Sequence, residues 1–262
     1  MLVTTGCGIS QSSWAKWPTW PKYCNMVCDH INLGAPAVGN HYIALSLLKY
    51  VSKIKPDCII ITWTSYNKLD IFVEDAELAE NIHNYPSRNF LVNWNGSIVS
   101  GPNAWWPSSV SNDNPIKHAY AKQASDKFHA LTTLQSVLLI QQHCKTNSIP
   151  LYQYMSYEWP LEEWSRDTDI NWLYNMIDWT AFEQKSLAND YYHSRWIKYQ
   201  HNEQYGLIPT AGWHAEFFKS DILPILVKHF NIRPIKIDNL IDAARILSKK
   251  LYDENTDNTK QE

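Results

Sequence analysis

Cys58-Ile-Ile-Ile-Thr-Trp63 is an uninterrupted run of apolar and β-branched residues, and Lys55-Pro56-Asp57 separates it from the segment before it. A run this short and this uniformly apolar predicts a strand that is covered on both faces, as the strands of parallel sheets are. Strands are also predicted at residues 2–7 and 30–33, and helices at 21–29 and 41–53. Three strands alternating with two helices predict a doubly wound α/β fold, with three α/β/α layers and a mostly parallel sheet.

The remainder of the chain continues this pattern after one interruption. Residues 70–115 are rich in Asn, Trp, Ser and Pro and lack a long period, which predicts an irregular excursion from the sheet. A helix is predicted at 116–147, a strand at 149–155, a helical or loop-like aromatic stretch at 158–204, and a turn at 205–214 before a last helix at 215–230. An amphipathic helix at 237–251 and a disordered tail at 253–262 complete a single domain over residues 1–252.

Composition excludes several classes of function. The 262 residues carry a net charge of −3, and the 23 basic residues are 18 Lys and 5 Arg, which disfavours a nucleic-acid surface. No run approaches the 18 apolar residues of a membrane span, and no signal peptide is recognised, so a cytoplasmic protein without a membrane partner is expected. Five cysteines without paired CxxC spacing predict neither a disulfide framework nor a zinc site, and no cofactor or metal is expected. Oligomeric state is not set by the sequence.

Polar and glycine-rich segments follow the first three predicted strands. Ligands of open α/β sheets bind at the carboxyl ends of the strands, so these segments form the predicted site together with a late turn at 206–214. The three segments are Gly6-Cys-Gly-Ile-Ser10, residues 34–40, and Trp63-Thr-Ser-Tyr-Asn67. Their order along the chain resembles that of the SGNH (GDSL-like) hydrolases. The resemblance implies a flavodoxin-like three-layer fold and hydrolysis of a carboxyl ester.

The first blocks of the resemblance place several residues at functional positions. Where the family has a Gly-Asp-Ser turn, this chain has Gly6, Cys7 and Gly8, so Gly8 stands at the nucleophile position and Ser10 is the nearest hydroxyl. Gly39 matches the glycine whose backbone N–H joins the family's oxyanion hole, and Asn40 follows it. The third block, which supplies an amide to the same hole, corresponds here to the residues after Trp63, namely Thr64, Ser65 and Asn67.

The last block departs from the family's Asp-x-x-His-Pro. Alignment on Pro209 places Tyr205 at the acid position and Ile208 at the base position. His214 lies five residues after that proline, where relatives often have a further, non-catalytic histidine. The sequence therefore leaves two hypotheses from different classes of function.

The first hypothesis is an ester hydrolase acting on a small-molecule or carbohydrate ester. Ser10 would attack, His214 would act as base, and the backbone of Gly8 and Gly39 with Asn40 or Asn67 would bind the oxyanion. Cys7 is a second candidate nucleophile, because a helix N-terminus lowers the pKa of a thiol. Each residue also has a structural interpretation: Ser10 as a helix cap, His214 as a packed side chain, and Cys7 as a buried thiol at the end of a strand.

The second hypothesis is a binding protein that kept the sheet and the site but lost hydrolysis. Its ligand would be a carbohydrate or another polar ring compound stacked on Trp side chains, since aromatic faces supply large rigid contact areas. The candidates are Trp63, Trp105, Trp106 and Trp213. Trp105 and Trp106 are favoured, because neighbouring side chains of an extended segment point to opposite sides and one core can hardly bury both.

Overall fold

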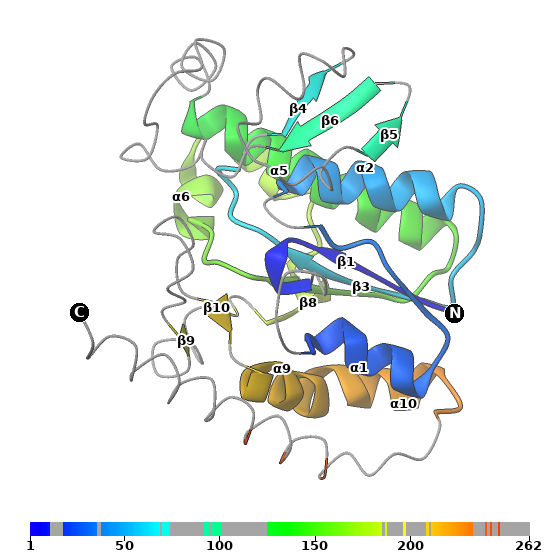
Figure 1. The fold of residues 1–262 in the computed structure, drawn as a ribbon. Coiled ribbons are helices and arrows are strands. Elements are labelled where there is room, and N and C mark those ends of the chain that lie inside the picture. The colour runs from blue at the N-terminus through cyan, green and yellow to red at the C-terminus, as the bar shows by residue number, and fades with distance from the viewer. Residues whose placement is uncertain are drawn as a thin grey trace.

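A five-stranded, all-parallel sheet forms the centre of the protein in a computed structural model (Figure 1). The order β2-β1-β3-β7-β8 is the 2-1-3-4-5 order of flavodoxin-like sheets and confirms the predicted fold class. The strands are β1 (Leu2–Gly6), β2 (His30–Asn32), β3 (Cys58–Trp63), β7 (Leu151–Met155) and β8 (Phe182–Gln184). The structure describes residues 1–10, 18–35, 38–68, 70–73, 92–94, 96–100, 125–184, 187, 196–197, 208–209 and 211–232, and the single positions 239, 242 and 246.

Strand β3 is the central strand, as its apolar run predicts. It pairs with β1 on one side and with β7 on the other, and all six of its residues are buried. Ile59, Ile61 and Trp63 pack into one hydrophobic cluster, whereas Cys58 and Ile60 pack into another. This alternation follows from the period of two along a strand, and it means that a separate core lies on each face of the sheet.

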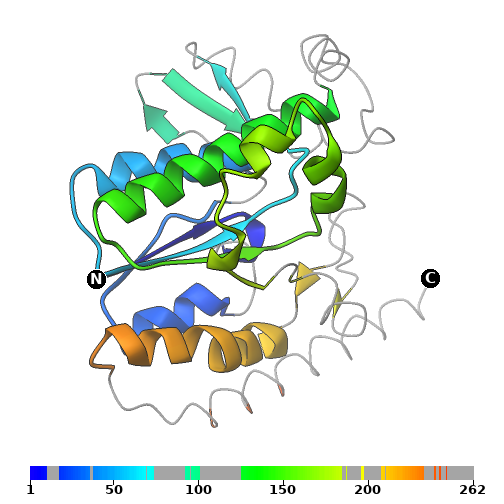
Figure 2. The same cartoon turned by 180° about the vertical axis from the view of Figure 1, so that it is seen from behind.

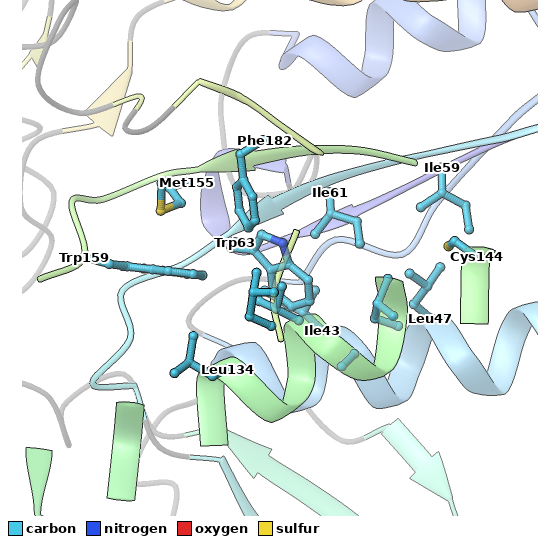
Figure 3. Packing of buried hydrophobic residues seen from close by; sticks show 14 of the residues in the cluster. Ile43, Leu47, Ile59, Ile61, Trp63, Leu134, Cys144, Met155, Trp159 and Phe182 are labelled. Carbon is cyan, nitrogen blue, oxygen red and sulfur yellow. The ribbon is translucent and has the colours of Figure 1, made fainter. Parts of the chain in front are cut away.

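Helices cover both faces of the sheet (Figures 1 and 2). One layer contains α2 (Asn40–Val51) and α5 (Asp126–Thr146), and the short helices α6 (Leu161–Arg166) and α7 (Asn171–Tyr174) adjoin α5. Figure 3 shows Ile43 and Leu47 from α2 and Leu134 and Cys144 from α5 packing towards Ile59, Ile61 and Trp63. The other layer contains α1 (Trp20–Val27), α9 (Ala211–Phe217), a π-helical turn (Phe218–Ile222) and α10 (Leu223–His229).

The segment at 70–115 is more regular than predicted. Its described parts form a three-stranded antiparallel sheet in the order β4-β6-β5, which lies above α2 and α5 in Figure 1. The strands are β4 (Asp70–Val73), β5 (Val92–Trp94) and β6 (Gly96–Ser100). Strands of three to five residues give too short an alternation to be recognised among many Asn, Ser and Pro residues.

Three further differences concern the second half of the chain. The aromatic stretch at 158–204 contains the short edge strand β8, which follows a 3-10 turn (Trp179–Ala181), and β9 (Trp196–Ile197) pairs antiparallel with β10 (Ile208–Pro209). Helix α9 begins at Ala211, so the predicted helix start at 215 was wrong and His214 lies within the helix. The described part of the predicted helix at 116–147 begins at Asp126, after Ser125, whose Oγ accepts a hydrogen bond from the Phe128 N–H (3.2 Å). The predictions for 253–262, and for most of 237–251, lie outside the described residues.

None of the described helices combines the length and apolarity that crossing a membrane requires. The five cysteines are free thiols, four of them buried.

Candidate functional site

The carboxyl ends of β1 and β3 mark the point where the order of the sheet reverses. The chain passes from β1 through α1 to β2 on one side, and then through α2 to β3 on the other side. Because α1 and α2 lie on opposite faces, the loops after β1 and β3 diverge here, as they do at the ligand-binding crevice of open α/β sheets. The predicted site residues after β1, β2 and β3 are therefore brought to one edge of the sheet.

Ser10 ends a 3-10 turn (Gly8–Ser10) that follows β1 directly. The Ser10 N–H donates to the Cys7 carbonyl (2.8 Å), and the Ser10 hydroxyl forms a hydrogen bond with the Thr62 hydroxyl on β3. Gly6 makes this contact possible: its φ is +154°, and a Cβ at that position would lie 2.5 Å from Ser10 Oγ. The Ser10 side chain is completely buried.

Asn32 at the end of β2 holds the same turn from the other side. Its side-chain amide donates to the Ser10 carbonyl (2.7 Å), and its Oδ1 accepts from the Gly34 N–H (2.9 Å). Sequence reasoning missed Asn32, because an asparagine at the end of a short strand gives no signal of a partner 22 residues away.

His214 lies in the first turns of α9, beside the N-terminus of α1. Its Nδ1 accepts a hydrogen bond from the Trp20 N–H (3.3 Å), and the ring is 1% exposed. Burial lowers the pKa of His214 to about 3, because the low-dielectric surroundings disfavour the charged ring. Since Nδ1 acts as acceptor, the neutral ring carries its proton on Nε2.

The predicted nucleophile and base thus have different partners. The Ser10 hydroxyl pairs with Thr62, and the lone pair of His214 Nδ1 faces Trp20. No hydrogen bond joins Ser10 to His214, both of which are described. A serine hydroxyl becomes a nucleophile only when a base within hydrogen-bond reach accepts its proton, so this arrangement contains no activated serine.

Cys7 lies at the same edge and is buried. Its thiol makes a long hydrogen bond to Ser156 Oγ (3.9 Å), which follows β7. Burial raises the pKa of the nearby Tyr157 hydroxyl, and the neighbouring Cys7 contributes in the same direction. Cys7, Ser156 and Tyr157 are therefore a thiol and two hydroxyls in neutral, apolar surroundings. Gly8 precedes Ser10 in the 3-10 turn and is half-buried.

The predicted oxyanion donors also have partners within the fold. The Gly39 N–H donates to Asp70 Oδ1 (2.7 Å). Asn40 Oδ1 accepts from the Thr64 N–H (2.8 Å), and Asn40 Nδ2 donates to Thr133 Oγ1 on α5 (3.2 Å). Asn40 thereby fastens the start of α2 to the loop after β3.

Two more predicted residues pair with each other after β3. The Ser65 hydroxyl donates to Asn67 Oδ1 (2.7 Å). The Thr64 hydroxyl behaves differently: it is completely buried and has no hydrogen-bond partner, as is also true of the Thr5 hydroxyl in β1. Buried hydroxyls in folded proteins are normally paired, so these two are exceptions at the ends of adjacent strands.

Two of the four candidate tryptophans for ligand stacking belong to the core. Trp63 is completely buried and donates from Nε1 to Gln153 Oε1 (3.0 Å). Trp213 is 3% exposed and stacks on Phe217, with ring centroids 5.0 Å apart. Neither presents a free face to a ligand. Trp105 and Trp106 lie outside the described residues, as does Tyr205, and of Ile208 only the backbone is described.

The described side chains do not form a group of three or more His, Cys, Asp or Glu residues that would hold a metal ion. The chemistry available at the edge is therefore that of hydroxyls, one thiol, one neutral imidazole and backbone N–H groups.

Comparisons with known proteins place this architecture in context. No protein-family model matches the sequence, and no curated protein matches it either. Among solved structures, the chain is similar to the crystal structure of a GDSL-like lipase from Bacteroides thetaiotaomicron, with 12% sequence identity over 87% of each chain and a TM-score of 0.38.

Proposed function

We propose that this protein binds a small polar ligand, of the carbohydrate class, at the carboxyl ends of β1 and β3, and that it does not hydrolyse esters there. One contrast carries the proposal: the Ser10 hydroxyl and His214 Nδ1 have partners inside the fold, whereas the Thr5 and Thr64 hydroxyls have none. An unpaired buried hydroxyl costs free energy that an incoming hydrogen-bonding group can offset.

The class of ligand follows from the chemistry of these groups. A threonine hydroxyl can both donate and accept, which suits the hydroxyls of a sugar better than a charged group. The edge also offers the Ser156 hydroxyl and the Tyr157 hydroxyl, which stays protonated because burial raises its pKa.

The test is ligand binding by a threonine variant with a matched control. Thr64→Val removes the hydroxyl while keeping the branched shape, and Thr132→Val does the same on α5, where the hydroxyl donates to the Phe128 carbonyl (2.8 Å). For monosaccharides that bind in NMR titrations, Thr64→Val should weaken binding about tenfold, since one hydrogen bond contributes roughly 1.4 kcal/mol. Thr132→Val should bind as wild type does. Equal affinities in all three proteins, or the lack of any sugar binding, would overturn the proposal.

Ester hydrolysis is the second candidate, favoured by the position of Ser10 and His214 at the carboxyl edge of the sheet. It requires Ser10 to leave Thr62 and His214 to leave the Trp20 N–H. Turnover of short-chain aryl esters that disappears in both Ser10→Ala and His214→Ala would establish this function. Under the proposed binding function, wild type and both variants should show the same background rate.

A further inference from the structure

The N-terminus of α2 holds a carboxylate that comes from elsewhere in the chain. Asp70 accepts hydrogen bonds from two backbone groups of this helix start, the Gly39 N–H at Oδ1 (2.7 Å) and the Tyr42 N–H at Oδ2 (2.8 Å). Both oxygens are used, so the carboxylate lies across the end of the helix as a bound acetate would. The partial positive charge of a helix N-terminus stabilises such an anion.

The geometry of Gly39 is fitted to this carboxylate. A Cβ on Gly39 would lie 2.5 Å from Asp70 Oδ2 and 2.9 Å from the Lys68 carbonyl oxygen, both far closer than van der Waals contact. A glycine is therefore required for the carboxylate to reach the Gly39 N–H. The charge of Asp70 also acts on the neighbouring side chain: burial, and then Asp70, raise the pKa of Tyr42 to about 12.

An ordinary helix cap comes from the N-cap residue itself. Here the N-cap is Gly39, which has no side chain, and the acceptor lies 31 residues further along the chain. Asp70 is the first residue of β4, and β4 belongs to the small antiparallel sheet beside α2 (Figure 1). The contact therefore ties that sheet to the edge where the candidate site lies.

A second observation places an unfilled polar group beside the same helix start. The Thr64 N–H donates to Asn40, the first residue of α2, and the buried Thr64 hydroxyl has no partner. The N-terminus of α2 thus adjoins both an internal anion and a hydroxyl without a hydrogen bond.

We propose that Asp70 is an intramolecular plug: its carboxylate occupies an oxyanion site formed by the Gly39 and Tyr42 N–H groups, and movement of β4 away from α2 opens this site to a carboxylate or phosphate group of a ligand. The contact is autoinhibitory, because the N–H group that would bind an external oxyanion is held by the chain itself. It is independent of whether the neighbouring threonines bind sugars.

The experiment removes the plug and supplies its chemistry from solution. Asp70→Ala vacates the two N–H groups, and Asp178→Ala is the matched control, since Asp178 caps a different turn by accepting from the Thr180 N–H (3.0 Å). Thermal unfolding is measured with sodium acetate, with inorganic phosphate, and with sodium chloride at equal ionic strength. At about ten times its Kd, the anion should raise the Tm of Asp70→Ala by roughly 3–6 °C more than chloride does, and should leave wild type and Asp178→Ala at the chloride value.

An amide NMR signal separates a plug from a mere structural anchor. The Gly39 amide proton should move upfield in Asp70→Ala and return downfield as acetate is added, with no such change in Asp178→Ala. Should Asp70→Ala fail to fold, Asp70→Asn retains an uncharged acceptor, and phosphate should then raise its Tm more than that of wild type. Equal responses of wild type and every Asp70 variant to the anions, or a Gly39 amide that does not respond to them, would overturn the proposal.

Discussion

Replacement of Asn40 by alanine separates a structural role from a catalytic one. In the fold, Asn40 Oδ1 accepts from the Thr64 N–H and Asn40 Nδ2 donates to Thr133 Oγ1. Asn40 is 2% exposed and Thr64 is completely buried, so water cannot readily replace the lost amide. An oxyanion donor held ready for substrate would instead cost the protein little stability when removed.

The expected loss follows from the two hydrogen bonds. Leaving the buried Thr64 N–H without an acceptor costs about 1–3 kcal/mol, and the second hydrogen bond contributes about 1 kcal/mol. Alanine regains roughly 0.5 kcal/mol in helix propensity at the start of α2. The free energy of unfolding should therefore fall by about 2–3 kcal/mol, which corresponds to a Tm lower by about 4–12 °C for a protein of this size.

Urea unfolding followed by tryptophan fluorescence measures this loss. Asn147→Ala is the control: Asn147 caps α5 from an exposed position, where its amide donates to the His143 carbonyl (2.8 Å), and its loss should change stability by about 0.5 kcal/mol or less. The m-value should be the same in all three proteins. A loss below about 1 kcal/mol in Asn40→Ala would refute the structural role and restore Asn40 as a candidate oxyanion donor.

Three further changes test the packing around the site. Because the fold keeps His214 neutral, the unfolded chain takes up a proton below pH 6.5 that the folded protein refuses until about pH 3, so stability falls as the pH drops through this window. At about 1.4 kcal/mol per pH unit, His214→Gln should lose about 2 kcal/mol less than wild type between pH 6.5 and 5 in urea unfolding; parallel curves would contradict the buried neutral ring. Gly6→Ala introduces a Cβ against Ser10 at a positive φ and should lower the free energy of unfolding by about 2–4 kcal/mol, and a neutral effect would show that the 3-10 turn is wrongly placed. Trp63→Phe leaves Gln153 Oε1 without its donor and should cost about 2–3 kcal/mol by thermal unfolding, whereas enhanced stability would argue against the Trp63–Gln153 hydrogen bond.

The parts of the fold that the sequence predicts are those with a strong local pattern. The apolar run of β3, the helical period of α2 and the long helix α5 each bury a face that is legible over several residues. Because β-α-β units connect in few ways, these elements suffice to predict a parallel sheet with helices on both faces. The edge strand β8 escaped, since Phe-Glu-Gln offers a single apolar residue.

The partners of the site residues were not predictable from such patterns. The position of Gly39 at an oxyanion site follows from its place after β2, but its pairing with Asp70 depends on how a separate small sheet folds back on α2. Ser10 faces Thr62 because Gly6 lets two strand ends approach closely. Sequence reasoning places a residue at an edge of the sheet, whereas a hydrogen bond is decided by ångström-scale geometry over long separations.

The central position of β3 has a consequence for how the chain reaches its native state. Trp63 and Gln153 form a hydrogen bond across 90 residues of sequence, and the strands that contain them pair along their whole length. Such non-local pairing slows folding, because the intervening chain must close a long loop before the contacts form. During synthesis, β1, β2 and β3 emerge well before β7, and the apolar edge of β3 stays unpaired in that interval. Protection of this edge on the ribosome, by chaperones or by the small β4-β6-β5 sheet that follows it, therefore governs the yield of folded protein.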